Sequence, residues 1–471
     1  MIAGLKPYAE YKESGLPWLG KVPVHWEVKR AKSIFQRVDI RSKTGQEELL
    51  TVSSARGIVP RKTANVTMFK AESYLGYKLC WPGDLVINSL WAWAGGLGVS
   101  KHHGIISSAY GVYRIREDAP MLPAFIHEVA RSSSFNWELK VRSKGVWISR
   151  LQLTDISFLD APMHIPPVVE QDAIVRFLDW ANGRLERAIR AKRKVIALLN
   201  EQKQAIIHRA VTRGLDPSVP LKPSGIPWLG DIPQHWEIWR ISRFARVGNG
   251  STPSRAKPVY WTNGRFPWLN SSQVNRGFID CADQFVTEAA LRECHLPRVP
   301  AGSVLVAITG QGKTRGTSAI LCIEATINQH IAFITPRAPL ASAQYIHLAL
   351  VAAYGHLRAI SDDSGSTKGA ITCEDLKRFK IAIPPRSEQD ELIEQIRAQT
   401  HGLDSAISRL TSEIELLREY RTRLVADVVT GKLDVREAAA KLPVEEQTIE
   451  PEELVEDDSE MMEDEITEPA G

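Results

Sequence analysis

The sequence has few cysteines and no long apolar run. Only five of its 471 residues are cysteine, and no two of them form a CxxC pair. This odd, scattered set excludes a disulfide framework and a CxxC zinc site, and it fits reduced thiols. No stretch approaches the roughly 18 apolar residues that span a bilayer, and Met1 to Gly15 lack a hydrophobic signal segment. We therefore expect a soluble, cytoplasmic protein.

The net charge is small but unevenly distributed. The chain has 59 Lys and Arg against 55 Asp and Glu, a formal balance of +4. Thirteen of the acids lie between Pro443 and Gly471, which contain no Lys or Arg, so Met1 to Leu442 holds 59 basic and 42 acidic residues, or +17. With 44% hydrophobic residues the body can bury a core, which excludes global disorder. A basic body predicts a polyanionic partner.

Two sequence blocks occur twice in the chain. Such an internal repeat indicates the domain organisation independently of any functional motif. SGLPWLG at 14–20, followed by HWE at 25–27, recurs as SGIPWLG at 224–230 with HWE at 235–237, an offset of 210 residues. IPP at 165–167 with EQD at 170–172 recurs 218 residues later. The two regions between these blocks show little similarity to each other. A duplicated frame around two divergent inserts predicts one task performed at two places with two specificities.

A seven-residue apolar pattern follows each Pro-Pro pair. It predicts two helices of roughly 44 residues, each about 65 Å long, that pair as an antiparallel coiled coil. The alternative is that each helix packs only on its own globular domain. The apolar seam that defines the pattern includes Ile174, Leu178, Leu185, Leu199, Leu392, Ile396, Leu403, Leu410, Leu417 and Leu424.

Between the repeated blocks the pattern is typical of mixed α/β structure. Short apolar runs bounded by Gly, Pro and Asp predict strands over 84–88, 111–115 and 303–308. Residues 120–132 and 341–353 predict short helices. The fold class we expect is α/β, with two mixed α/β domains, two long paired helices and a pseudo-twofold internal repeat.

No segment forms a recognisable catalytic or metal site. Residues 310–314 end like a phosphate-binding loop, but the required upstream glycine is Ala307. The 138–140 segment with Asp118 faintly resembles a nuclease core, although Glu-x-Lys is common on solvated helices. His102 and His103 lack Cys or carboxylate partners at ligand spacing. A self-sufficient methyltransferase or nuclease with an unrecognised active site stays open as the alternative.

Polar and basic loops in both inserts match DNA recognition instead. Lys and Arg beside small residues can approach phosphates, and Asn, Gln and Arg carry the paired donors and acceptors that contact base edges. The candidate DNA-binding residues are Asn88, Trp91, Trp93, Lys101, Arg142, Lys144, Trp147, Arg150, Thr252, Ser254, Arg255, Asn270, Gln273, Gln311, Lys313, Thr314, Arg315, Asn328, Gln329 and Lys368. The four Trp of the repeated blocks, Trp18, Trp26, Trp228 and Trp236, are expected to be packing anchors.

The order of these blocks resembles the specificity (S) subunit of type I restriction-modification systems. The resemblance rests on the order of the blocks: SGLPWLG and HWE, then an insert, then IPP and EQD, then a long helix. This order occurs twice and ends with the segment 421–434. Segments 84–93, 308–316 and 324–330 resemble the target recognition domains of that family. The acidic tail departs from the family pattern. It could be a disordered solubilising extension, a partner contact or an intramolecular DNA mimic.

The resemblance implies a subunit without catalytic activity that binds double-stranded DNA. Each target recognition domain would read one half of a bipartite site, and the helices would fix the gap and dock two methylation (M) subunits. Two restriction (R) subunits are further expected partners. S-adenosylmethionine, ATP and Mg would be bound by partner subunits, and this chain would bind none of them. Substitution of Gln311 or Arg315 should alter recognition of one half-site and leave the other unchanged. The implied domains are 1–160 (N-terminal recognition, opening motif 13–30), 161–216 (helical spacer), 217–380 (C-terminal recognition, opening motif 223–240), 381–436 (helical spacer) and 437–471 (acidic, disordered tail).

Overall fold

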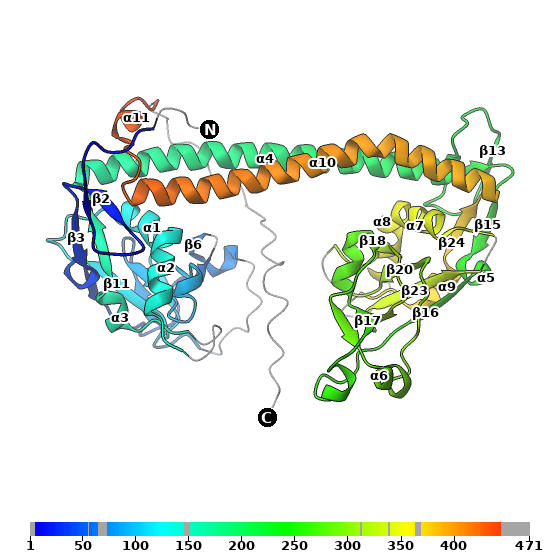
Figure 1. Ribbon diagram of the computed structural model, residues 1–471, viewed down its shortest axis with the longest axis horizontal. Helices are drawn as coiled ribbons and strands as arrows, with labels where there is room; N and C mark the ends of the chain where they lie inside the picture. Colours follow the sequence, from blue (N-terminus) through cyan, green and yellow to red (C-terminus); the bar gives the residue numbers. More distant parts are fainter. Residues whose placement is uncertain are drawn as a thin grey trace. The chain divides into compact units, whose positions relative to one another are not determined.

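The computed structural model describes residues 5–54, 56–64, 73–145, 151–310, 313–337, 340–362 and 369–443. Helices and strands intermix along the chain, which confirms the mixed α/β expectation. The chain divides into two compact units, unit 1 (Met1–Ala191 with Glu413–Gly471) and unit 2 (Lys192–Ser412). Both unit boundaries fall inside long helices, α4 (Val168–Arg213) and α10 (Arg386–Val429), which are green and orange in Figure 1.

The insert of unit 1 is built on a four-stranded antiparallel sheet in the order β4-β11-β8-β9. Helices α1 (Pro123–Arg131), α2 (Ser133–Arg142) and α3 (Asp155–Leu159) contribute to the same apolar core. The strands of unit 1 are β1 (Tyr11–Glu13), β2 (Lys21–Pro23), β3 (Glu27–Arg30), β4 (Phe35–Arg37), β5 (Leu50–Ser53), β6 (Gly57–Pro60), β7 (Lys78–Cys80), β8 (Leu85–Ile87), β9 (Leu97–Val99), β10 (Gly104–Ile106), β11 (Gly111–Ile115) and β12 (Pro162–Ile165). After α10, helix α11 (Arg436–Ala440) completes the unit.

The insert of unit 2 contains a five-stranded sheet, β16-β23-β20-β21-β18, and a three-stranded sheet, β19-β17-β22. Its strands are β13 (Leu221–Pro223), β14 (Asp231–Pro233), β15 (Glu237–Arg240), β16 (Ala245–Asn249), β17 (Phe266–Leu269), β18 (Phe278–Ile279), β19 (Gln284–Val286), β20 (Ser303–Ala307), β21 (Ser318–Leu321), β22 (Thr326–Ile327), β23 (Ile331–Pro336) and β24 (Lys380–Ile383). Its short helices are α5 (Ile241–Phe244), α6 (Glu288–Glu293), α7 (Ala343–Ala352), α8 (Tyr354–Asp362) and α9 (Cys373–Arg378). The predicted strands and short helices match β8, β11, β20, α1 and α7.

The repeated blocks fold into the same local structure in each unit. Antiparallel β1 and β2 correspond to β13 and β14, with Tyr11 opposite Pro23 in one pair and Leu221 opposite Pro233 in the other. Strand β3 pairs with β12, and β15 pairs with β24 in the same way. We call these repeated strands, together with α4 and α10, the frame.

A glutamate from the EQD block binds the HW pair in each unit. In unit 1 the fully buried Trp26 donates its indole N–H to Glu170 at 2.9 Å, and His25 Nε2 lies 2.8 Å from the same carboxylate. In unit 2, Trp236 and His235 make the same contacts with Glu388, both at 2.9 Å. The burial of Trp26 and Trp236 confirms that they are packing anchors.

The neighbouring glutamine of each EQD block fixes the start of its long helix. Gln171 is fully buried and donates to the carbonyl of Pro166 at 2.8 Å. Gln389 is equally buried and donates to the carbonyl of Pro384 at 3.0 Å. The amide thus satisfies a carbonyl in the turn that precedes the helix, where Pro already interrupts regular bonding.

Segments of α4 and α10 lie side by side within each unit (Figure 1). In unit 1, Glu186 and Arg421 form an ion pair at 3.5 Å, and in unit 2 Lys203 and Asp404 lie 2.5 Å apart. The predicted seam positions that are buried are Ile174, Leu178, Leu392, Ile396 and Leu424, and those that are half-buried are Leu185, Leu199, Leu403, Leu410 and Leu417. Pairing as a continuous coiled coil stays a prediction.

Several buried apolar residues of α4 lie outside the ten seam positions, among them Ala173, Phe177, Ile189, Ile207, Ala210 and Val211. Ile189 is only 2% exposed, although the seven-residue pattern places it beside the seam and not in it. A straight helix with 3.6 residues per turn drifts from a strict seven-residue repeat, so a seam written in heptads misses such positions. Throughout the described segments, no helix combines the length and apolar character needed to cross a membrane.

Candidate nucleic-acid interface

Several loops of unit 2 meet at one edge of its sheets. The loop after β20 is tied to the β22–β23 loop, because the Ile308 N–H donates to the His330 carbonyl at 2.9 Å. The loop after β16 packs against the same edge, where a Cβ at Gly250 would overlap the carbonyl oxygen of Ile327. Glycine is therefore required at this close approach. These contacts bring together loop segments that are up to 80 residues apart in the sequence.

Four side chains in these loops form a hydrogen-bonded chain, which we call the polar loop cluster: Thr252, Thr309, Gln329 and His330. The Thr252 hydroxyl donates to Gln329 Oε1 at 2.5 Å, and Gln329 Nε2 lies 3.1 Å from His330 Nε2. His330 Nδ1 in turn lies 2.7 Å from the Thr309 hydroxyl. Thr252 and Gln329 are exposed, so an oriented amide with a donor and an acceptor faces solvent. Such an amide can read a base edge.

Arg255 lies on an aromatic surface next to this cluster in the sequence. Its guanidinium is 3.7 Å from the centre of the Trp261 ring and 5.3 Å from that of Trp268. It also donates to Gln284 Oε1 at 2.5 Å. Partial burial lowers the pKa of Arg255, but a guanidinium stays charged at neutral pH. The exposed, stacked cation is suited to a phosphate or to the edge of a guanine.

Four other candidates of unit 2 hold the loops in shape. Asn270 and Gln273 form a capping box at the start of a 3₁₀ turn, and Gln273 is only 3% exposed. Buried Asn328 accepts the backbone N–H of His330 at 3.0 Å. Arg315 is 6% exposed and donates to the carbonyl of Gly369 at 2.7 Å. These contacts favour loop support over base readout, and a DNA contact by these four residues stays a prediction.

The remaining described candidates of this insert are Ser254, Lys313 and Thr314. Lys313 and Ser254 are exposed, and the Tyr354 hydroxyl donates to the Lys313 carbonyl at 2.8 Å. Thr314 accepts the side-chain amide of Asn275 at 3.2 Å. The Lys313 side chain therefore extends from a backbone that is fixed by α8.

In unit 1, the indoles of exposed Trp91 and half-buried Trp93 form a stacked platform. The rings of Trp91 and Trp93 lie 5.9 Å apart with 20° between their planes, and Trp91 is 44% exposed. Lys140 of α2 places its ammonium 5.8 Å from the centre of the Trp93 ring. Asn88 caps the turn before the platform, accepting the Leu90 N–H at 3.2 Å. An aromatic surface beside a cation suits an unstacked base or a sugar-phosphate backbone.

The basic candidates of unit 1 are more dispersed. Lys101 and Lys144 are exposed, whereas Arg142 is bound to buried Glu138 one helical turn away. The Glu138 carboxylate is therefore engaged in an ion pair with Arg142. Four candidates lie outside the described residues: Trp147, Arg150, Gln311 and Lys368.

Four contributors to these surfaces are absent from the list of candidate residues: Lys140, Trp261, Thr309 and His330, of which the last two lie in the predicted segments 308–316 and 324–330. Lys140, Trp261 and Thr309 gain their roles from neighbours that only folding supplies. Lys140 lies 47 residues after Trp93, so no local spacing could have paired them. Within the described ranges, no group of three or more His, Cys, Asp or Glu side chains is placed to hold a metal ion.

Comparison with known proteins confirms the resemblance that the repeated blocks predicted. Residues 233–415 match the family model for the type I restriction modification DNA specificity domain. The chain is 27% identical over 180 residues to the EcoR124I/EcoR124II type I restriction enzyme specificity subunit of Escherichia coli, and these residues cover 38% of this chain and 44% of that protein. It is 29% identical over 190 residues to the MjaIX specificity subunit of Methanocaldococcus jannaschii, covering 37% and 43%. These alignments span less than half of each relative.

The fold itself has a counterpart among solved structures. A chain from a study of complex assembly and conformational transition in the type I restriction-modification system superposes with a TM-score of 0.59. The superposition covers 88% of this chain and 99% of that chain at 16% sequence identity. The two proteins therefore share a fold beyond the region matched by the family model.

Proposed function

We propose that this chain, with its similarity to type I restriction-modification specificity subunits, is the subunit that gives such a complex its DNA sequence specificity, without catalytic activity of its own. The observation that carries the proposal is the match of residues 233–415 to the DNA specificity domain. The fold likeness over 88% of the chain and the balance of +17 before Pro443 support it further.

The duplicated frame supports a bipartite DNA site. We assign one half-site to the insert of unit 1 and the other to the insert of unit 2, with recognition domains over 1–160 and 217–380. The long helices over 161–216 and 381–436 then form a paired spacer that sets the gap between the half-sites. Two readers on one side of a duplex work best about one helical turn apart, near 10 bp, so a stiff spacer makes the gap part of the specificity.

Catalysis then belongs to partner subunits. We propose that the chain docks two M subunits and, in the full complex, two R subunits, in the cytoplasm. Adenine methylation requires the target base to be flipped out of the duplex, so the specificity subunit would hold a deformed duplex for its partner. S-adenosylmethionine, ATP and Mg would be bound by those partners.

The experiment that tests the proposal compares the purified chain alone with the chain plus its M subunit on DNA from random-sequence selection. We expect a split sequence motif and methylation only when the M subunit is present. Methylation or cleavage by the chain alone would support a self-sufficient enzyme instead. The absence of any split motif would contradict the proposal and favour a scaffold without DNA preference.

Substitution in the polar loop cluster should affect one half-site only. Replacing Gln329 with alanine removes an oriented amide, and a lost base contact is worth about 1–3 kcal/mol, or roughly 5–150-fold in affinity. We expect relaxed preference at a base of one half-site while the other is unchanged, measured by selection on random DNA. Trp91→Ala in unit 1 should weaken the opposite half.

The matched control is Gln234→Ala, which removes an exposed amide from the β14–β15 turn of unit 2. We expect it to leave both half-sites unchanged. If Gln329→Ala weakens binding to all sequences equally, the cluster contacts the backbone of DNA and does not read bases.

The length of the helices should set the accepted gap. Removing seven residues from each of α4 and α10 shortens both by about 10.5 Å at 1.5 Å per residue, which corresponds to about 3 bp at 3.4 Å per step. We expect methylation to move to sites with a shorter gap between unchanged half-sites, read by mapping methylated adenines. An unchanged gap would contradict the spacer role.

A further inference from the structure

In unit 1, Tyr8 closes the site around the EQD glutamate. Its hydroxyl donates to Glu170, its ring lies edge-on to Trp26 at 5.9 Å, and Tyr8 is only 5% exposed. The Arg436 guanidinium lies 5.1 Å from the centre of the Tyr8 ring and binds both oxygens of Asp434, at 3.0 and 2.6 Å. A tyrosine with a cation on its face thus completes the first copy of the repeated site.

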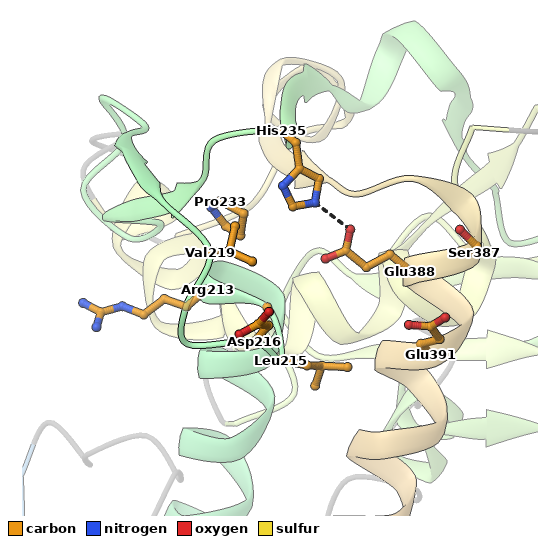
Figure 2. Close-up of a pocket in the computed structure, with 10 residues that line it drawn as sticks. Arg213, Leu215, Asp216, Val219, Pro233, His235, Ser387, Glu388 and Glu391 are labelled. Carbon is orange, nitrogen blue, oxygen red and sulfur yellow. Dashed lines mark hydrogen bonds and ion pairs between the residues drawn. The ribbon is translucent and has the colours of Figure 1, made fainter.

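The second copy has no tyrosine at this position. The offset of 210 residues that relates β1 to β13 places Ser218 where Tyr8 stands, and the offset of 218 that relates the long helices places Asp216 where Asp434 stands. Ser218 is exposed, and its short side chain donates to Asp216 Oδ1 at 2.6 Å. Instead of a side chain, an open pocket of about 320 Å³ lies beside Glu388 (Figure 2).

The pocket is lined by acidic groups and has an apolar wall. Asp216, Glu388 and Glu391 contribute carboxylates, His235 is bound to Glu388, and Val219 lies across from Glu388 and Glu391 (Figure 2). The Arg213 side chain extends away from Glu388 in the same view. The pocket volume falls in the range of about 300–1,000 Å³ that is typical of ligand sites.

Glu170 and Glu388 differ in their burial and in the number of hydrogen bonds that their carboxylates accept. Glu170 is 4% exposed and its Oε1 accepts both the Trp26 indole and the Tyr8 hydroxyl. Glu388 is 25% exposed, and within the described residues its Oε1 accepts only the Trp236 indole. Because the first copy binds a third donor with the same carboxylate geometry, the second copy can accept one as well.

We propose that the pocket beside Glu388 binds a tyrosine side chain with a neighbouring cationic side chain, presented by a partner polypeptide. The phenol hydroxyl donates to Glu388, the ring packs on Val219, and the cation faces Asp216 and Glu391. The first copy of the site shows this chemistry with Tyr8 and Arg436 from the chain itself. The carboxylates exclude a DNA phosphate and the chain's own acidic residues beyond Pro443 as occupants. This proposal does not rest on the DNA-binding function.

The test titrates the full chain, labelled with ¹⁵N at its Trp indoles, with the dipeptide acetyl-Tyr-Arg-amide. We expect saturable shifts of the Trp236 indole resonance and none of Trp26, whose site Tyr8 already fills. Acetyl-Phe-Arg-amide and acetyl-Tyr-Glu-amide should each bind at least fivefold more weakly, because each lacks one of the two donors. A parallel titration with tyramine tests whether the ligand is a small aromatic amine and not a polypeptide.

Two variants complete the test. Ser218→Tyr supplies the missing phenol from the chain and should weaken dipeptide binding at least tenfold, whereas Ser218→Ala, which changes the same position without filling the pocket, should bind like the unmodified chain. Equal binding of the Tyr and Phe dipeptides, shifts unaffected by Ser218→Tyr, or binding of tyramine without binding of acetyl-Tyr-Arg-amide would each overturn the proposal.

Discussion

Replacing Glu170 with alanine is expected to lower the free energy of unfolding of unit 1 by about 3–5 kcal/mol, the range measured when one partner of a buried charged network is removed. The Glu170 carboxylate accepts three donors, from Tyr8, His25 and Trp26, while being only 4% exposed. Without it, buried N–H and O–H groups lose their acceptor, and a cavity is left. Denaturant unfolding followed by hydrogen exchange of unit 1 amides would measure the loss.

The matched control is Glu388→Ala in the second copy of the site. Glu388 is 25% exposed and accepts donors from His235 and Trp236, which water can partly satisfy after the substitution. We expect a loss of about 1–2 kcal/mol there, confined to unit 2. Equal losses from the two substitutions would mean that the third donor and the deeper burial of Glu170 add nothing to stability.

In the unmodified chain, unit 1 is expected to lose stability as the pH rises, because Glu128 ionises. Replacing Glu128 with glutamine is expected to abolish this pH dependence. Burial, with a smaller effect of Asp179, raises the pKa of Glu128 to about 7, against the lowering effects of Arg131, Arg421 and Lys101. The folded protein therefore prefers the protonated acid. The contribution of protonated Glu128 to the free energy of unfolding is fully present below the unfolded-state pKa of about 4.3 and is lost as the pH rises through 7. By pH 8 this loss lowers the free energy of unfolding by about 3 kcal/mol.

The measurement is the free energy of unfolding at pH 5 and pH 8 for the unmodified chain and for Glu128→Gln. The glutamine variant should gain most at pH 8 and little at pH 5. Glu117→Gln, an exposed position of the same unit, should leave the pH dependence unchanged. An identical pH slope in the Glu128 variant and the unmodified chain would show that Glu128 ionises in the folded state without penalty.

Periodicity predicted the elements whose signals are local. The apolar run over 303–308 became β20, with every residue of Ser303–Ala307 buried, and the pattern after each Pro-Pro pair became α4 and α10. The contact of the HW pair with the EQD glutamate could not be predicted in the same way. His25 and Glu170 are 145 residues apart, and repetition shows that two blocks occur together without showing that they touch.

The candidate interface was predictable in residue type but not in exposure. Gln329 and Gln273 look alike in a polar loop, yet Gln329 faces solvent, whereas Gln273 is buried and donates to Asp283 at 3.0 Å. Loops that leave regular structure need side chains to satisfy their backbone groups. The same Asn, Gln and Arg residues that suit base recognition also suit that task, so composition alone cannot separate the two roles.

The way each insert leaves the frame has an evolutionary consequence. The first insert departs after β3 and returns at β12, its antiparallel partner, and the second departs after β15 and returns at β24. Departure and return are therefore adjacent, and inserts of 131 and 139 residues fit the same frame. Recombination between genes that carry the same repeated blocks could exchange one insert for another of different length without moving a frame residue. If the inserts read DNA as proposed, a new recognition sequence would be acquired in a single genetic event while the frame is inherited intact.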